Sequence, residues 1–177
     1  MIITIGGPPG SGKTTVAELL ANECDLMLIS TGRLFREMAS ARGISLGEFG
    51  RLAEEDGDID RDLDRRVIDE VVRNLDARLV VEGRLAAHMV DRRGLKALKV
   101  LIDAPLDVRA RRISKREGKP LAEVKREMLE REKCERARYD AFYGIDLDDT
   151  GIYDLVIDSG DIAPEDIVKR IRENAGI

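Results

Sequence analysis

Short apolar runs alternate with longer amphipathic stretches along this chain. The runs are bounded by polar residues or glycine, and they are Ile2–Ile5, Leu26–Ile29, Leu79–Val81, Val100–Ile102 and Leu155–Ile157. Because apolar residues follow one another with little alternation, each run is typical of a strand that is buried on both faces. The pattern predicts an α/β fold in which helices cover both faces of a five-stranded parallel sheet.

Two long regions break this alternation of strands and helices. Residues 31–76 hold no predicted strand but several helical stretches. Residues 106–143 are helical in pattern but mostly charged, and Leu121, Val124 and Met128 form only a narrow apolar stripe. A helix with little apolar surface to bury is held weakly and can move. We expect both regions to be inserts over the carboxyl edge of the sheet, where ligands bind in open α/β folds.

A glycine-rich motif follows the first predicted strand. The segment Gly7-Pro8-Pro9-Gly10-Ser11-Gly12-Lys13-Thr14 matches G-x-x-x-x-G-K-[ST] without a substitution, and a helical pattern follows it. The backbone N–H groups of such a loop converge on phosphate oxygens, and the N-terminus of the helix adds positive potential. Lys13 can then reach the β- and γ-phosphates of a nucleotide, while Thr14 is placed to bind Mg²⁺. The motif therefore predicts a P-loop NTPase.

We expect every residue of this loop, and the one after it, to contact ATP. These residues are Gly7, Pro8, Pro9, Gly10, Ser11, Gly12, Lys13, Thr14 and Thr15.

A carboxylate ends the third predicted strand. Glu82 follows the apolar residues 79–81 and precedes Gly83-Arg84. A carboxylate at the tip of a central strand is suitably placed to hold a Mg²⁺-bound water beside the phosphate loop. The alternative is a surface carboxylate in a turn, but the apolar residues before it and the glycine after it favour a metal site formed by Thr14 and Glu82.

Composition limits the partners and the compartment. The 177 residues suffice for a single domain with a core, which we assign to residues 1–177. A net charge of −5 and an aromatic content of 3% argue against nucleic-acid binding. The first strand begins near the N-terminus, and no apolar run is long enough to span a membrane. With two widely separated cysteines, Cys24 and Cys134, these features predict a cytoplasmic protein with no membrane partner, which we expect to be a monomer.

Positive charge is concentrated in one of the two inserts. Between Asp107 and Arg138 there are 12 lysines and arginines against 7 aspartates and glutamates. Taken singly, an arginine here is more often part of a solvated, ion-paired helix face. Because guanidinium groups match phosphate oxygens, so many of them in a phosphate-binding chain favour contacts with transferred phosphate. Two sets share a helix face by their spacing: Arg109, Arg112 and Arg116, and Arg131, Glu135 and Arg138.

Several of these segments together resemble one family. The chain is similar to nucleoside monophosphate kinases, and most closely to the archaeal type of cytidylate kinase. The resemblance rests on the loop segment, on Ser30-Thr31-Gly32-Arg33-Leu34-Phe35-Arg36, on Glu82-Gly83-Arg84 and on Tyr153-Asp154-Leu155-Val156-Ile157-Asp158. It covers nearly the whole chain and keeps the motif order. It implies a five-stranded P-loop core, an acceptor-binding insert at residues 31–76 and a mobile lid region at residues 106–143.

The resemblance also implies roles for particular residues. The acceptor, CMP, would be held by Ser30, Gly32, Arg36, Arg61, Arg84, Arg131 and Arg138, and the residues expected to act in catalysis are Lys13, Arg84, Arg112, Arg116 and Arg131. The sequence departs from the bacterial cytidylate kinases at three positions, where Ser30, Glu82 and Glu135 replace aspartate. A carboxylate remains at two of the three, so the departures bear on base selectivity rather than on the chemistry.

These observations predict reversible phosphoryl transfer from Mg·ATP to CMP, and to dCMP as well. In-line transfer needs positioning and charge neutralisation more than a covalent intermediate, so we expect no side-chain nucleophile. One alternative is another small-acceptor kinase, for AMP, UMP or a hydroxyl substrate. A second is a nucleotide-dependent switch or assembly factor, although the chain has no Asn-Lys-x-Asp segment for reading guanine.

Overall fold

A parallel sheet forms the centre of the molecule. The computed structural model describes the backbone of residues 1–177 and every side chain except that of Leu46. In this described part the strands are β1 Ile2–Gly6, β2 Met27–Ser30, β3 Leu79–Glu82, β4 Leu98–Asp103 and β5 Leu155–Asp158. They lie in the order β2-β3-β1-β4-β5, and each neighbouring pair is parallel. The predicted five-stranded parallel sheet is confirmed.

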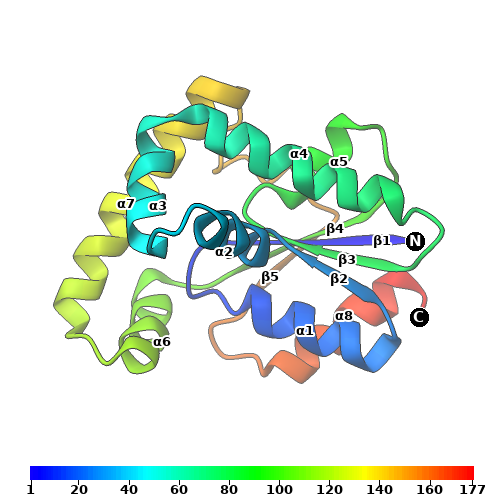
Figure 1. The fold of residues 1–177 in the computed structure, drawn as a ribbon. Helices are drawn as coiled ribbons and strands as arrows, with labels where there is room; N and C mark the ends of the chain where they lie inside the picture. Colours follow the sequence, from blue (N-terminus) through cyan, green and yellow to red (C-terminus); the bar gives the residue numbers. More distant parts are fainter.

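Helices follow the strands and cover both faces of the sheet (Figure 1). They are α1 Lys13–Cys24, α2 Thr31–Ala41, α3 Leu46–Glu55, α4 Gly57–Arg73, α5 Ala86–Arg92, α6 Leu106–Glu117, α7 Leu121–Tyr143 and α8 Pro164–Ala175. Helices α1 and α8 lie on one face, and α4 and α5 lie on the other. One expected strand residue, Leu26, instead lies in the turn after α1, where its N–H donates to the carbonyl of Ala21 at 2.9 Å.

The side chains of β1 show why the strands appear in the sequence as continuous apolar runs. Ile3 and Ile5 enter the core formed with α1 and α8, where they meet Leu20. Ile2 points to the opposite face and joins the core of α4 and α5, which includes Val67. Because successive strand residues point to opposite faces, a strand covered on both sides needs apolar residues at consecutive positions.

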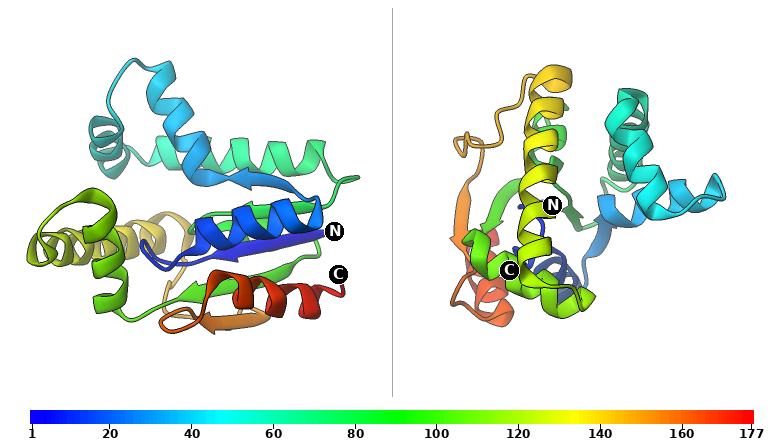
Figure 2. Two further views of the ribbon diagram at one scale, coloured as in Figure 1. Left: turned by 90° about the horizontal axis from the view of Figure 1, so that it is seen from below. Right: turned by 90° about the vertical axis from the view of Figure 1, so that its left-hand side faces the viewer.

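Each of the two long regions between strands has a small apolar core of its own. In residues 31–76, Phe49 of α3 packs with Met38 of α2 and Leu63 of α4. In residues 106–143, Ile113 of α6 packs with Val124 of α7. Figure 2 shows α3, α6 and much of α7 beyond the carboxyl ends of the strands, whereas both chain termini lie at the other end. The carboxyl edge of the sheet is therefore flanked by two helical units, each with a separate core.

Neither thiol is in a disulfide. Cys24 is half-buried and Cys134 is exposed. In the part of the chain that the structure describes, no helix combines the length and the apolar character that crossing a bilayer requires.

Candidate active site

The glycine-rich loop connects β1 to α1 and rests on the end of β4. Gly7 has a φ of +153°, and a Cβ at this position would lie 2.1 Å from the carbonyl oxygen of Ile102. Only glycine can therefore take this conformation against the neighbouring strand. α1 starts at Lys13, and in the described structure its N-cap, Gly12, provides no side-chain hydrogen bond and its first turn carries no acidic residue. The N–H groups of that turn are left to bind an anion.

Glu82 links the loop to two strands of the sheet. It is paired in register with Ser30 of β2 and Ile5 of β1, and only 4% of its surface is exposed. Thr14 Oγ1 donates to Glu82 Oε1 at 3.2 Å, and Ser30 Oγ donates to Glu82 Oε2 at 2.8 Å. The predicted pair Thr14 and Glu82 thus lies together. A hydroxyl and a carboxylate side by side are hard oxygen donors of the kind that Mg²⁺ binds, so this pair fits the metal.

Lys13 lies beside the same carboxylate. Its Nζ is 3.9 Å from Glu82 Oε1, and the side chain is largely covered. Burial lowers the pKa of Lys13 below its ordinary value, Glu82 opposes this shift, and Arg84 adds to it. The ammonium is therefore held in a pocket where positive charge is already crowded. A phosphate group entering there would relieve that repulsion.

The turn after Glu82 passes directly under the start of α2. A Cβ on Gly83 would lie 2.1 Å from Thr31 Oγ1, so a larger residue would push β3 and α2 apart. This close approach puts Arg84 next to the first residues of the acceptor insert.

Arg84 in turn reaches across to α7. Its Nε is 3.2 Å from Glu135 Oε2, and Arg131 Nε donates to Glu135 Oε1 at 2.8 Å. The buried Glu135 is thus flanked by two guanidinium groups. Charge on Arg84, Arg131 and Glu135 also acts on the pKa of Lys13, which places all three in its electrostatic environment. The structure thus brings three of the predicted catalytic residues, Lys13, Arg84 and Arg131, together from three separate segments.

Arg112 lies against the phosphate loop. Its Nη2 donates to the carbonyl of Ser159 at 2.7 Å and its Nη1 to Ser159 Oγ at 3.0 Å, with Gly10 and Ser11 carbonyls at 3.4 Å. Ser159 Oγ itself donates to the carbonyl of Ser11 at 2.7 Å. Sequence reasoning missed Ser159. The available signal was its place just after β5, at the carboxyl edge of the sheet.

The other two arginines predicted to share this face of α6, Arg109 and Arg116, have different surroundings. Arg109 is buried, donates to the carbonyl of Ala104 at 2.9 Å and pairs with Glu132 of α7. It ties α6 to α7. The side chain of Arg116 is 68% exposed and pairs with Glu117 at 2.8 Å. Arg116 therefore does not meet the loop in this structure, and its expected contact with phosphate remains a prediction.

The predicted acceptor residues are only partly gathered. Ser30 caps α2 by accepting from the N–H of Arg33 at 3.3 Å. Arg36 Nη1 lies 3.7 Å from where a Cβ on Gly32 would stand, and among the described side chains no carboxylate is within ion-pair distance of Arg36. The Arg36 side chain therefore extends back toward Gly32 in the first turn of α2, and Ser30 just before it contacts Glu82.

Arg61 lies near the end of α7, about one helical turn beyond Arg138. It pairs with Asp58, and its guanidinium carbon is 5.7 Å from the ring centre of Phe142. It lines a cavity of about 240 Å³ between α4 and α5 that also includes His88 and Tyr143. The structure does not bring Arg61 to the Lys13 cluster. Arg61 was assigned to the acceptor by the family resemblance alone, and its acceptor role remains a prediction.

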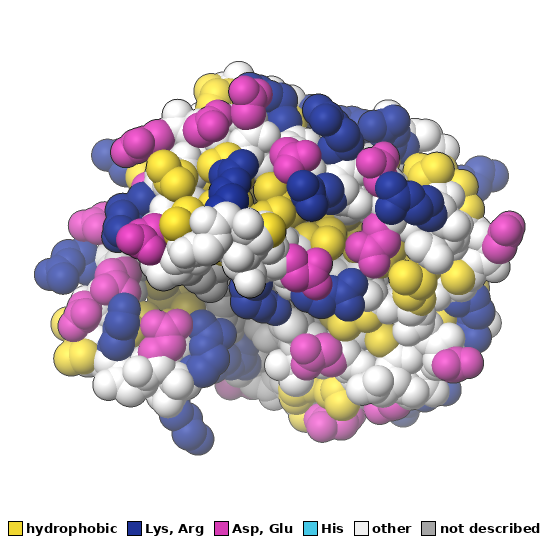
Figure 3. All heavy atoms as spheres, viewed as in Figure 1, with side chains coloured by type: hydrophobic (Ala, Val, Ile, Leu, Met, Phe, Trp, Pro, Cys, Tyr) yellow, Lys and Arg dark blue, Asp and Glu magenta, His cyan; other side chains and the backbone are white. Residues whose placement is uncertain are grey.

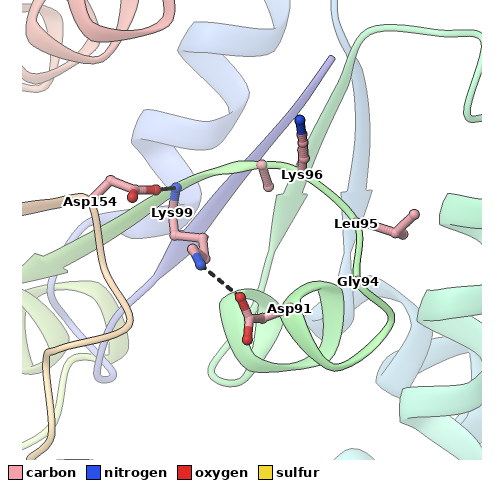
Figure 4. Close-up of a pocket in the computed structure, with 7 residues that line it drawn as sticks. Asp91, Gly94, Leu95, Lys96, Lys99 and Asp154 are labelled. Atoms are coloured by element: carbon pink, nitrogen blue, oxygen red, sulfur yellow. Dashed lines mark hydrogen bonds and ion pairs between the residues drawn. The ribbon is translucent and has the colours of Figure 1, made fainter.

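Figure 3 shows the surface hollowed near the phosphate loop, between the acceptor insert and α6. A larger cavity, of about 470 Å³, lies elsewhere (Figure 4). There Lys99 Nζ donates to Asp91 at 2.8 Å, and the N–H of Lys99 donates to Asp154 at 2.7 Å. Lys99 is near the amino end of β4, so this cavity is at the edge of the sheet opposite the phosphate loop. It has no part in the site.

A phosphate loop, a strand-end carboxylate beside the lysine of that loop, and two arginines that meet at Glu135, Arg84 from the turn after β3 and Arg131 from α7, define a P-loop kinase. The model of the cytidylate kinase-like family matches residues 2–161. The chain belongs to this family, as its sequence motifs predicted.

Individual relatives agree with this assignment. A cytidylate kinase of Methanocaldococcus jannaschii is 48% identical over 160 residues, which cover 90% of this chain and 88% of that protein. A cytidylate kinase of Methanococcoides burtonii is 48% identical over 159 residues, covering 90% of this chain and 87% of the relative. A shikimate kinase structure from Bacteroides thetaiotaomicron shares the fold, with a TM-score of 0.65 at 20% identity, and covers 100% of this chain and 99% of that one.

Proposed function

We propose that this protein transfers the γ-phosphoryl group of ATP reversibly to CMP and dCMP, giving ADP and the corresponding diphosphate. The observation that carries the proposal is the convergence of Lys13, Glu82 and Arg84 with Glu135 and Arg131 beside the phosphate loop. Family membership, and the two cytidylate kinases described above, favour a cytidine nucleotide as the acceptor.

The reaction needs positioning and charge neutralisation. The loop N–H groups and Lys13 would hold the β- and γ-phosphates of ATP. Arg84 and Arg131 would hold the phosphate of CMP, with Ser30 and Arg36 on its nucleoside side. One oxygen of the CMP phosphate attacks the γ-phosphorus while the bond from that phosphorus to the β–γ bridging oxygen breaks, so ADP leaves with that oxygen. Because the attacking phosphate is already ionised, the step requires no strong base.

Mg²⁺ would be held through Thr14 and, by way of water, Glu82. When bound, the ion would neutralise charge on the β- and γ-phosphates. The hydrogen bonds from Thr14 and Ser30 fix the rotamer of Glu82 and keep its carboxylate at the end of β3.

The number of guanidinium groups favours a phosphate over a hydroxyl as the acceptor. Arg84 and Arg131 share the single carboxylate of Glu135, and Arg36 also lies near the acceptor side, so a neutral hydroxyl substrate would leave net positive charge there. We further propose that the enzyme is a cytoplasmic monomer whose partners are free nucleotides, not nucleic acid.

The deciding experiment measures ADP formation from Mg·ATP with CMP, dCMP, UMP, AMP or shikimate as the acceptor. We expect kcat/KM for CMP to exceed that for AMP by at least about tenfold, or ~1.4 kcal/mol of transition-state binding. UMP should also be poorer, because uracil has a carbonyl where cytosine has an amino group. An equal or better rate with AMP or UMP would leave a monophosphate kinase but refute the choice of CMP. Turnover of shikimate alone would indicate a hydroxyl kinase, and no turnover would favour a nucleotide switch.

A further inference from the structure

The first turns of α4 lie against the last turns of α7. Asp60 Oδ2 is 2.8 Å from Arg138 Nε. Arg61 lies over the ring of Phe142, and a Cβ on Gly57 would come within 2.6 Å of the same ring. The end of α7 is therefore packed against the acceptor insert, even though α7 also forms the separate core with α6.

The ion pair between Asp60 and Arg138 is buried. The side chain of Asp60 is 9% exposed and that of Arg138 is 14% exposed. Burial raises the pKa of Asp60, whereas the charge of Arg138 opposes the shift. Removing two charges from water costs about as much as their attraction returns, so a buried pair contributes little net stability. Such a pair does fix the position of the two groups.

Arg138 is held from two helices of the insert. Besides Asp60 of α4, the carbonyl of Ala53 in α3 accepts from Arg138 Nη1 at 3.5 Å. Arg138 is also one helical turn beyond Glu135, which meets Arg84 beside the phosphate loop. The guanidinium of Arg138 thus contacts the insert at residues 31–76, and the same helix face carries Glu135, which pairs with Arg84 near Lys13.

We propose that Asp60 is a positioning residue for the acceptor nucleotide, acting by holding Arg138 and joining α7 to the acceptor insert. This inference rests on the proposed function, in which Arg138 contacts CMP. An arginine has a long and flexible side chain, so without the carboxylate the guanidinium spreads over several rotamers. The acceptor would then bind to an Arg138 side chain that is no longer held in one position. The phosphate loop would be unchanged, because it is built on other elements.

The test compares Asp60→Asn with Asp62→Asn by steady-state kinetics and thermal unfolding. Asp62 is the matched control, because it is a more exposed carboxylate on the same helix and pairs with Arg66. We expect Asp60→Asn to raise the KM for CMP about tenfold and to change the KM for ATP less than about twofold. Asp62→Asn should change neither. A loss of Tm with both KM values unchanged would overturn the proposal, since it would make Asp60 merely structural.

A double-mutant cycle tests whether Asp60 acts through Arg138. We expect Arg138→Gln to raise the KM for CMP, and Asp60→Asn to add little in that background. Fully additive effects would overturn the proposal. If Arg138→Gln leaves the KM for CMP unchanged, the acceptor role of Arg138 fails, and the positioning role of Asp60 fails with it. Absence of CMP turnover in the unmodified protein would instead refute the proposed function itself.

A second variant keeps the test decisive if Asp60→Asn does not fold. Asp60→Glu retains the charge and displaces it by one methylene group. We expect a smaller rise in the KM for CMP than with asparagine, and again no change for ATP. An equal rise in both KM values would contradict a role confined to the acceptor.

Discussion

Thr14 Oγ1 donates a hydrogen bond to Glu82 Oε1 at 3.2 Å, although the two residues are 68 positions apart. Thr14 lies in the first turn of the helix after the phosphate loop, and Glu82 ends a strand next to β1. The contact therefore joins the nucleotide loop to the sheet edge, and Ser30 extends it to β2. A metal bound by this pair would be located relative to both the donor loop and the start of the acceptor insert.

Glu82→Gln should raise the Mg²⁺ concentration needed for half-maximal rate. Glutamine keeps the size of the side chain but removes the charge that would orient metal-bound water. The measurement is a Mg²⁺ titration of the initial rate at saturating ATP and CMP. Asp158→Asn is a suitable control, because Asp158 is an exposed strand-end carboxylate of β5. An unchanged Mg²⁺ response would mean that Glu82 has only a structural role in the turn after β3.

Lys13→Ala should lower kcat by about a hundredfold or more, since the ammonium is expected to stabilise the charge that develops on the transferred phosphoryl group. Its Tm should stay close to that of the parent, because Glu82 retains its hydrogen bonds from Thr14 and Ser30. Single-turnover kinetics and calorimetry give the two values, and Lys115→Ala, at an exposed position of α6, serves as the control. Near-normal turnover by a folded Lys13→Ala enzyme would refute the phosphate-loop assignment.

The arginines should divide by substrate. Arg36→Gln and Arg84→Gln should raise the KM for CMP more than the KM for ATP. Arg112→Gln should mainly lower kcat, because Arg112 lies against the phosphate loop. Arg116→Gln should lower kcat only if the lid closes, since Arg116 is exposed here. Initial-rate measurements with each substrate varied separate these effects, and equal changes in both KM values for all four variants would contradict the division.

Stability should depend on pH through Asp64. Burial raises the pKa of Asp64 to about 6, and the nearby Tyr143 side chain opposes the shift. Because this folded-state pKa is above the unfolded value, the residue contributes stability below about pH 4 that is lost as the pH rises through about 6. As the pH rises from 4 to 7, the unfolding free energy of Asp64→Asn should therefore increase relative to that of the parent by about 1–3 kcal/mol. Urea unfolding across this range tests it, and a difference that does not vary with pH would contradict it. The carboxyl also faces Asp60, Arg92 and Arg138, so those residues must be kept unchanged.

Local patterns in the sequence were sufficient for the sheet and the phosphate loop. A doubly covered strand needs consecutive apolar residues, and a loop that wraps phosphate needs glycine at positions such as Gly7, where the neighbouring strand leaves no space for a Cβ. Glu82 was predicted for a similar reason, because an apolar strand and a glycine turn bracket it within a few residues. Each of these requirements is met by residues that are close together in the chain.

Only the tertiary structure decided which parts of the molecule each helix face contacts. Spacing put Arg109, Arg112 and Arg116 on one face. The structure buries Arg109 between the loop and Glu132 of α7, joins Arg112 to the loop and to Ser159, and leaves Arg116 exposed at the end of α6. Asp60 and Arg138 are 78 positions apart, and no local pattern connects them. The period of a helix fixes which of its residues share a face, but the neighbour that covers this face is set by how distant elements pack.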